Sequence, residues 1–169
     1  FEVIERLRQI NYERKQAAEG QQLTGKSADD LVLKANKNLA VDYITASPRM
    51  ALYIKYSARI YQIYLKYFAP EDMHVYSIDE IFIDITSYLA AYRVSPHELT
   101  MKIVKEVLRE TGITATAGIG SNLYLCKVAM DIMAKHIPAD ADGVRIAELD
   151  ETSYRQQLWD HKPLTDFWR

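Results

Sequence analysis

Two acidic residues, Asp79 and Glu80, stand side by side in the segment MHVYSIDEIFIDIT, whose other residues are mostly aliphatic, aromatic or β-branched. On one continuous strand their side chains would point to opposite faces among aliphatic neighbours, and an unpaired buried carboxylate is costly. The sequence leaves two alternatives. Either the chain turns there and both carboxylates reach water, or cations compensate their charge.

Magnesium suits the second alternative, because Mg²⁺ prefers oxygen ligands and takes one or two carboxylates together with phosphate oxygens. Two such ions would polarise an attacking hydroxyl and stabilise a leaving pyrophosphate. Asp84, further along the same segment, is expected to be a hydrogen-bonded structural acid.

A second group of polar residues follows a predicted strand in AGIGSNLYLCKVAMDIMAK. Ser121 or Asn122 is expected to begin a helix whose free backbone N–H groups could hold a phosphate, although the glycines match neither GxGxxG nor a P-loop. Along this helix Lys127, Asp131 and Lys135 recur at steps of four. They form either part of a binding site or a ladder of ion pairs on a solvated face.

The composition indicates a globular protein, with 49% apolar and 26% charged residues. The four histidines are scattered singly, with no second His or Cys at zinc-ligand spacing, which favours solvated or hydrogen-bonded histidines over a zinc site. Cys126 is the sole cysteine and cannot form an internal disulfide. The apolar runs are too short to span a membrane, and no secretory leader is visible. We therefore expect a cytoplasmic protein without a membrane partner.

The net charge of −2 conceals an asymmetry along the chain. Residues 1–70 carry 11 Lys and Arg against 7 Asp and Glu, whereas residues 71–169 carry 10 against 16. Charge by itself does not indicate nucleic-acid binding, for which a strong basic excess is typical. An acidic cluster in a nucleic-acid enzyme would need cations to meet phosphate.

The elements predicted around these residues alternate between helices and strands, and such alternation indicates the α+β or α/β class. The polar stretch 19–40 is expected to be a mobile surface excursion. The long helix after Ser47 and Pro48 carries a row of tyrosines, which either stack on bases or form a core face. The predicted elements are a helix from residue 1, a helix over 49–68, a hairpin over 73–86, a helix over 95–112, a strand over 113–120, a helix over 121–136, a strand over 143–149 and a helix over 150–160.

The string YSIDEIFIDIT, followed about thirty residues later by ITATAGIGSNLYLCKVAMDIMAK, resembles the palm of Y-family DNA polymerases, most of all the bacterial UmuC-like branch. SPRM before the long helix and PLTDFWR near the end extend the resemblance over residues 47–169. It implies an α+β, ferredoxin-like palm with a mixed or antiparallel sheet and helices packed on one face. Residues 1–46 would be a partial fingers subdomain with a polar insertion at 19–40.

The resemblance also implies roles for single residues. Asp79 would bridge two magnesium ions, and Glu80 would hold the catalytic ion near the primer 3′-hydroxyl. Lys135 matches a lysine that contacts the nucleotide triphosphate, and Lys127 matches one near the primer terminus. The residues before that lysine, Ser121 and Asn122, would also lie at the DNA. Leu123 stands where the family often has lysine, so one backbone contact is expected to be absent.

The function so implied is template-directed DNA synthesis across damaged DNA by two-metal nucleotidyl transfer. Primer-template DNA and a deoxynucleoside triphosphate would be the partners, with a sliding clamp bound through other regions. The family's strand with the first catalytic aspartate, and its thumb and little finger, have no counterpart in this sequence. The chain is therefore expected to be an inactive fragment that self-associates through exposed sheet edges. A non-catalytic palm-like interaction module and a nucleotide cyclase remain alternatives.

Overall fold

The computed structural model describes residues 1–167, which form two compact units divided between Pro48 and Arg49. The sequence placed the division two residues earlier, between 46 and 47. The last two residues of the motif PLTDFWR, Trp168 and Arg169, lie outside the described residues. Within residues 1–167, no helix combines the length and the apolar character that crossing a membrane requires.

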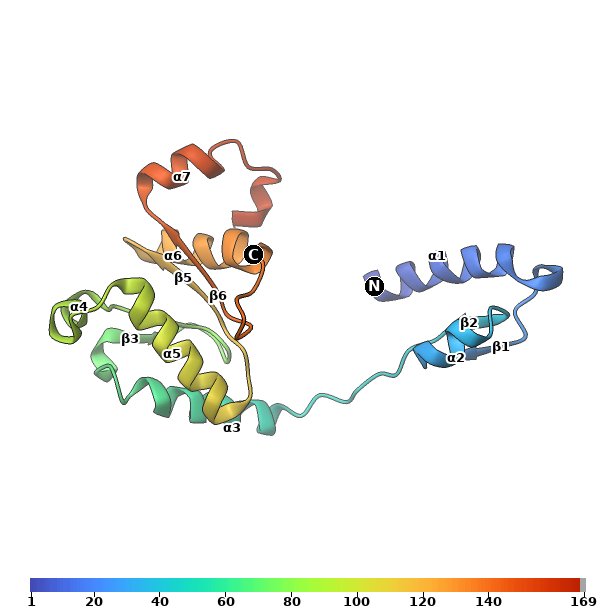
Figure 1. Ribbon diagram of the computed structural model, residues 1–169, viewed down its shortest axis with the longest axis horizontal. Coiled ribbons are helices and arrows are strands. Elements are labelled where there is room, and N and C mark those ends of the chain that lie inside the picture. Colours follow the sequence, from blue (N-terminus) through green and yellow to red (C-terminus); the bar gives the residue numbers. More distant parts are fainter. Residues whose placement is uncertain (168–169) are drawn as a thin grey trace. The chain divides into compact units, whose positions relative to one another are not determined.

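The first unit consists of one long helix and a small β-α-β arrangement (Figure 1). Strands β1 and β2 are parallel, with Gly25 paired to Leu39. Asp29 caps the intervening helix by accepting hydrogen bonds from the N–H groups of Leu31 and Val32. The elements are α1 (Glu2–Ala17), a 3₁₀ turn (Glu19–Gln21), β1 (Gly25–Ser27), α2 (Asp30–Ala35) and β2 (Leu39–Val41).

The stretch 19–40, expected to be a mobile surface excursion, contains β1, α2 and the start of β2, and side chains of α1 form hydrogen bonds to its backbone. The Asn11 amide donates to the Val41 carbonyl at 2.9 Å and accepts from the Val41 N–H at 2.7 Å. The Arg14 guanidinium donates to the carbonyls of Leu39, Leu33 and Asn36 at 2.7, 3.1 and 3.0 Å. Polar composition there reflects short exposed elements with many side-chain hydrogen bonds.

The second unit contains the remaining helices and strands (Figure 1). Helix α3 begins at Met50 with Arg49 as its N-cap, one residue after the predicted start at Arg49, and it ends at Tyr64, before the predicted end at Phe68. The elements are α3 (Met50–Tyr64), a 3₁₀ turn (Pro70–Asp72), β3 (Met73–Val75), β4 (Ile81–Ile83), α4 (Thr86–Tyr92), α5 (Pro96–Thr111), β5 (Thr116–Gly120), α6 (Leu123–Val128), a π turn (Ala129–Met133), a 3₁₀ turn (Ala134–His136), β6 (Arg145–Leu149), α7 (Glu151–Leu158) and a 3₁₀ turn (Leu164–Phe167).

The strands of the second unit form two separate ladders in the described part of the chain. Strands β3 and β4 are antiparallel, with Val75 opposite Ile81. Strands β5 and β6 are parallel, with Gly118 opposite Ala147. The mixture of parallel and antiparallel pairing with helices confirms the α+β class.

Helices cover both faces of the β5–β6 ladder, so the expected packing on one face is wrong here. Ala117 and Ile119 of β5 pack against the buried cluster that Val104 of α5 forms with Val144 and Ile146. Gly118 and its even-numbered neighbour Gly120 lie against the helical segment that follows β5. Because successive side chains of a strand point to opposite faces, α5 and α6 lie on opposite sides of the ladder.

Helix α5 starts and stops where local signals in the sequence predict. Ser95 and Glu98 form a capping box, and Gly112 ends the helix with a left-handed φ of 72°. The buried side chains of Leu99 and Ile103 join Phe68 in one core cluster, against which several tyrosines pack. The C-terminal end of the long helix α3 also belongs to the core, since Ile63 is buried, as the core-face alternative predicts. Near the start of α3, by contrast, Tyr53 is exposed.

Candidate functional site

The hairpin turn carries both adjacent carboxylates. The N–H groups of Tyr76 and Ser77 donate to the Glu80 carbonyl at 3.0 and 3.1 Å, which closes the turn just before β4. Asp79 lies in the turn with its side chain exposed, and the Ser77 hydroxyl donates to its Oδ1 at 2.8 Å. The chain therefore turns at this point, and neither carboxylate is buried among aliphatic side chains.

Asp84, beyond β4, has the structural role expected of it. Its carboxylate accepts a hydrogen bond from the Thr86 N–H at 2.9 Å at the start of α4. Hydrogen bonds from the Thr86 side chain and backbone lower the pKa of this carboxyl below its ordinary value. Asp84 is thus engaged in organising the chain after the hairpin.

Two glycines set the position of α6 beside β5. A Cβ atom on Gly118 would overlap the Cys126 carbonyl oxygen and the Met130 nitrogen, and one on Gly120 would overlap the Cys126 nitrogen. Asn122 then caps the helix by accepting from the Leu125 N–H at 2.9 Å. The glycines serve close strand–helix packing here, which explains why they do not follow a phosphate-loop spacing.

The helix that begins at Leu123 widens into a π turn at Ala129–Met133 before its last 3₁₀ turn. Single π turns inside α-helices commonly occur at functional sites. This one contains Asp131 and lies between Lys127 and Lys135. Both lysines pair with the Asp131 carboxylate.

A chain of ion pairs connects this helix to the hairpin. The Lys127 ammonium donates to Glu80 Oε1, and it lies 3.1 Å from Asp131 Oδ2. Lys135 Nζ lies 2.5 Å from Asp131 Oδ1. The side chains of Glu80, Lys127 and Asp131 are only 26–28% exposed, so these pairs are screened less than fully solvated ones. The ion pairs predicted between Lys127, Asp131 and Lys135 are therefore present. Glu80, 47 residues before Lys127 in the chain, adds a further carboxylate to them.

The charges of this cluster favour its ionised state. Partial burial acts to lower the pKa of the Lys127 ammonium, but hydrogen bonds from Lys127 to Glu80 and Asp131 outweigh burial and raise it. Burial likewise acts to raise the pKa of Asp131, and its bonds to Lys135 and Lys127 lower it overall. The cluster therefore holds a cation between two carboxylates.

Tyr76 is a member of the site that sequence reasoning missed. The Lys127 ammonium lies 5.5 Å from the centroid of its ring, within the range of a cation–π contact. The ring also meets Phe82 edge-on, with centroids 5.4 Å apart. The signal was its place in YSIDE, directly before the acidic turn.

Asp79, Ser121 and Asn122, which are further predicted site residues, have their described contacts outside this cluster of ion pairs. The hydrogen bond described for the Asp79 side chain goes to Ser77, within its own turn. Ser121 and Asn122 border a separate shallow hollow at the start of α6, which is also lined by Tyr124, Leu125, Glu151, Tyr154, Arg155 and Trp159. Lys135 is half-exposed and faces solvent beyond Asp131.

The donor set of the hairpin fits a magnesium ion that is completed by phosphate oxygens. Among residues 1–167, no three His, Cys, Asp or Glu side chains converge as a ready metal cage. Asp79 and Glu80 nevertheless offer two adjacent carboxylates, and Mg²⁺ is commonly held by one or two. Glu80 already accepts a hydrogen bond from a cation, the Lys127 ammonium. These two residues would hold the ion.

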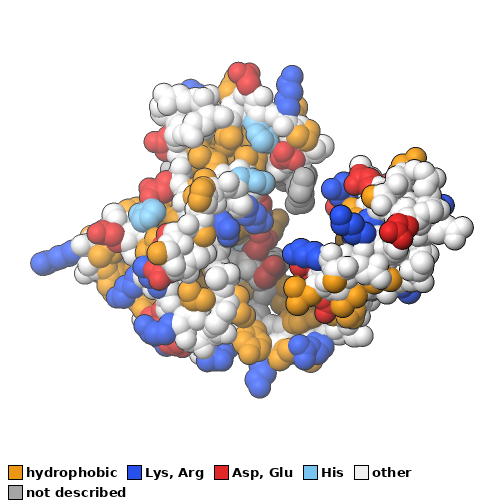
Figure 2. Space-filling view, turned by 45° about the vertical axis from the view of Figure 1, so that its right-hand side comes forward, with side chains coloured by type: hydrophobic (Ala, Val, Ile, Leu, Met, Phe, Trp, Pro, Cys, Tyr) orange, Lys and Arg blue, Asp and Glu red, His pale blue; other side chains and the backbone are white. Residues whose placement is uncertain are grey.

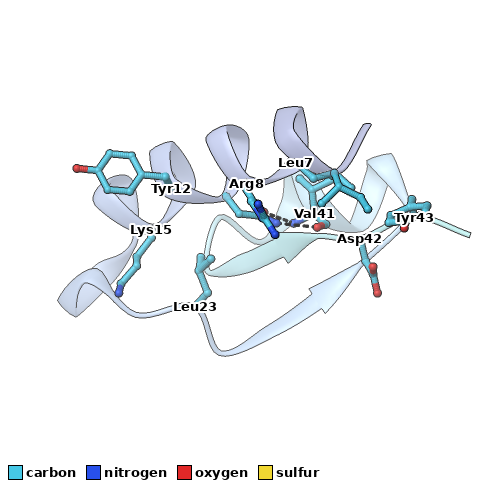
Figure 3. Close-up of a pocket in the computed structure, with 10 residues that line it drawn as sticks. Leu7, Arg8, Tyr12, Lys15, Leu23, Val41, Asp42 and Tyr43 are labelled. Atoms are coloured by element: carbon cyan, nitrogen blue, oxygen red, sulfur yellow. Dashed lines mark hydrogen bonds between the residues drawn. The ribbon is translucent and has the colours of Figure 1, made fainter. Parts of the chain in front are cut away.

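The first unit has a hollow of its own, of about 590 Å³, beside α1. It is lined by Arg8, Tyr12 and Lys15 of α1 and by Val41 and Tyr43 at and after the end of β2 (Figure 3). On the face seen in Figure 2, acidic and basic side chains are interspersed among hydrophobic ones. The hollow is shallow and mixed in character, and we assign no chemistry to it.

Comparison with known proteins decides the family. The profile of the impB/mucB/samB family matches residues 10–131, which include the hairpin and most of the following cluster. The chain belongs to this family. The impB/mucB/samB profile thus spans parts of both units and the Glu80, Lys127 and Asp131 cluster.

Relatives of this impB/mucB/samB chain are DNA polymerases and a repair protein. It is 38% identical over 116 residues to DNA polymerase IV 2 of Bacillus subtilis, covering 69% of this chain and 26% of that protein. It is 31% identical over 122 residues to the putative UV-damage repair protein UvrX of the same organism, covering 72% and 27%. The chain spans about a quarter of the length of these curated relatives.

A solved structure agrees with these sequence matches. The Y-family DNA polymerase chimera Dbh-Dpo4(243-245)-Dbh superposes with a TM-score of 0.53 and 26% identity, covering 69% of this chain and 30% of that one. The resemblance to Y-family polymerases seen in the sequence is therefore confirmed.

Proposed function

We propose that this chain supplies the metal-binding hairpin and its supporting helix to template-directed DNA synthesis across damaged DNA. The observation that carries the proposal is the Glu80–Lys127 ion pair, which joins the two family motifs at one point. In this proposal unit 2 is the palm and unit 1 is part of the fingers. The substrates are primer-template DNA and a deoxynucleoside triphosphate, which would place the protein in the cytoplasm.

Magnesium, when bound, would lower the pKa of the primer 3′-hydroxyl and neutralise charge on the triphosphate. Three side chains of this chain are placed where they could take part in this chemistry. Asp79 projects from the turn into solvent, where an ion and phosphate oxygens could reach it. Glu80 is held against the helix by Lys127, and Lys135 presents a half-exposed ammonium further along, available to an anionic triphosphate.

A segment exchange tests this function. In DNA polymerase IV 2 of Bacillus subtilis, the aligned region is replaced by this chain's, and primer extension past an abasic site is measured with Mg²⁺. We expect extension to persist and to fall by roughly 10²-fold or more in Asp79→Asn or Glu80→Gln, because each change removes a metal ligand. Equal extension by the exchanged protein and both variants would overturn the proposal.

The same preparations separate the alternatives. A nucleotide cyclase would form a cyclic product from ATP or GTP without primer or template. A folded exchanged protein that binds primer-template but never extends it would indicate a non-catalytic interaction module. Binding of a sliding clamp would be measured separately, because no described residue of this chain bears on it.

A further inference from the structure

We propose that the Lys127 ammonium is a built-in stand-in for the divalent cation on Glu80, which yields its place when the ion binds. The inference rests on the proposed function, since it concerns the same metal ligand. It assigns Lys127 a positioning role toward the metal site, beyond the place near the primer terminus that the family resemblance implies.

The first step of the argument is occupancy. Glu80 Oε1 accepts a hydrogen bond from Lys127 Nζ, and both side chains are less than 30% exposed. A cation bound to the same carboxylate oxygen must displace the ammonium, because the two positive charges would otherwise repel each other at close range. Lys127 and the ion therefore compete.

The second step is that Lys127 has other partners within reach once it leaves Glu80. Asp131 Oδ2 lies 3.1 Å from the same ammonium, and the face of Tyr76 lies 5.5 Å from it. Once Glu80 holds the ion, Lys127 keeps a carboxylate partner and an aromatic contact without crossing solvent. Asp131 can retain the ammonium because Lys135 pairs with its other oxygen and leaves Oδ2 available.

The third step is a benefit for the empty site. A carboxylate held by an ammonium keeps its position between ligand cycles, whereas a free Glu side chain loses rotamer freedom when it is ordered. Lys127 thus holds Glu80 near its working position at the expense of metal affinity.

Manganese binding to the whole 169-residue chain tests the competition, with free Mn²⁺ followed by its paramagnetic resonance signal. Lys127→Met should strengthen Mn²⁺ binding by about 3- to 10-fold, since a partly buried competing ion pair is removed. Lys135→Met is the matched control, because it removes the same charge from the same helix without touching Glu80. It should change binding by less than about twofold.

Asp131→Asn should act in the opposite direction. Without the second carboxylate, Lys127 has less to gain by leaving Glu80, and Mn²⁺ binding should weaken by about 2- to 3-fold. Lys127→Gln provides a second uncharged variant, and thermal melting of every variant checks that the fold persists. Binding that is unchanged or weaker in both Lys127→Met and Lys127→Gln would overturn the inference.

A direct view of Lys127 gives a readout that does not depend on affinity. The side-chain NH₃⁺ resonance of Lys127 should shift as Mg²⁺ is added, and the midpoint of this shift should equal the midpoint of Mg²⁺ binding. In Glu80→Gln the addition of Mg²⁺ should leave this resonance unshifted. An unmoved Lys127 resonance while Mg²⁺ binds would refute displacement. If Glu80→Gln instead binds Mn²⁺ as tightly as the unaltered chain, the metal site itself fails, and with it the proposed function.

Discussion

The Tyr67 hydroxyl donates a hydrogen bond to the Glu106 carboxylate and so joins the turn after α3 to helix α5. Lys66 Nζ adds ion pairs to Glu106 at 2.9 Å and to Glu110 at 2.5 Å. This polar group borders the core cluster of Phe68, and its ionisation makes the stability of unit 2 depend on pH.

Acid should weaken unit 2 through Glu106. The Tyr67 hydroxyl and Lys66 hold the pKa of this carboxyl at about 2, below its ordinary 4.5. The stabilisation is present above about pH 4.5 and is lost as the pH falls toward about 2. We expect a loss on the order of 1 kcal/mol, because the Lys66 partner is 48% exposed and water screens the pair. Urea unfolding across this range should show a flatter pH dependence for Glu106→Gln, with Tyr67→Phe in between; identical profiles would contradict the assignment.

Alkali should act through Tyr67. Burial, together with the Glu106 carboxylate, raises the pKa of this phenol to about 12 from its ordinary 10. The neutral phenol therefore favours the folded state below about pH 10, and this contribution disappears as the pH rises toward about 12. Absorbance titration of phenolate in wild type and Tyr67→Phe isolates this residue. A difference spectrum that titrates at about pH 10 would exclude the raised pKa.

Alanine at Gly120 should destabilise unit 2 strongly. Its Cβ would overlap backbone atoms of Leu125 and Cys126, which cannot move without shifting α6. We expect a loss of roughly 3 kcal/mol or more in urea unfolding. Gly112→Ala is the control, because a Cβ there would meet open space. The backbone at this position has a left-handed φ of 72°, so alanine should lower the free energy of unfolding by only about 1 kcal/mol. A smaller loss at Gly120 than at Gly112 would show that the close approach is not maintained.

Removing the Arg14 side chain should loosen the β1–α2–β2 stretch specifically. Three backbone carbonyls would lose their donor, at about 1 kcal/mol each. Amide hydrogen exchange in residues 25–41 should then accelerate by roughly tenfold or more. Arg8→Ala, on the same helix at the rim of the hollow, should leave these rates unchanged. Equal acceleration by both variants would mean that helix α1 itself had been weakened.

The two ladders of unit 2 should promote association between chains. Strands β4 and β5 each pair on one side only among the described residues, and unpaired strand edges invite further pairing. Sedimentation should show dimers or larger species that grow with concentration. A monomer at every concentration would indicate that these edges are protected.

Local signals in the sequence were sufficient for several elements. The Ser95 cap, Pro96 and Gly112 bounded α5, and Asn122 was one of two named candidates for the start of α6. These succeeded because capping depends on residues within one turn. The alternation of elements indicated α+β or α/β, and the family resemblance narrowed it to α+β.

Long-range contacts were beyond such signals. The Glu80–Lys127 pair joins residues 47 positions apart, and nothing near either residue specifies the other. Likewise, Arg14 orders a polar stretch that looked mobile because its carbonyl partners lie 19 to 25 residues away. The two-sided covering of β5 depended on glycines whose role appears only when α6 lies against them.

The π turn at Ala129–Met133 has a consequence for how this helix varies among related sequences. A π turn accommodates one residue more than the α-helical turn it replaces. Losing one residue between Lys127 and Lys135 would restore a regular helix and leave the flanking turns facing the same way. Sequence alignments of this segment should therefore place a single-residue gap inside the turn, so that both lysines keep their counterparts.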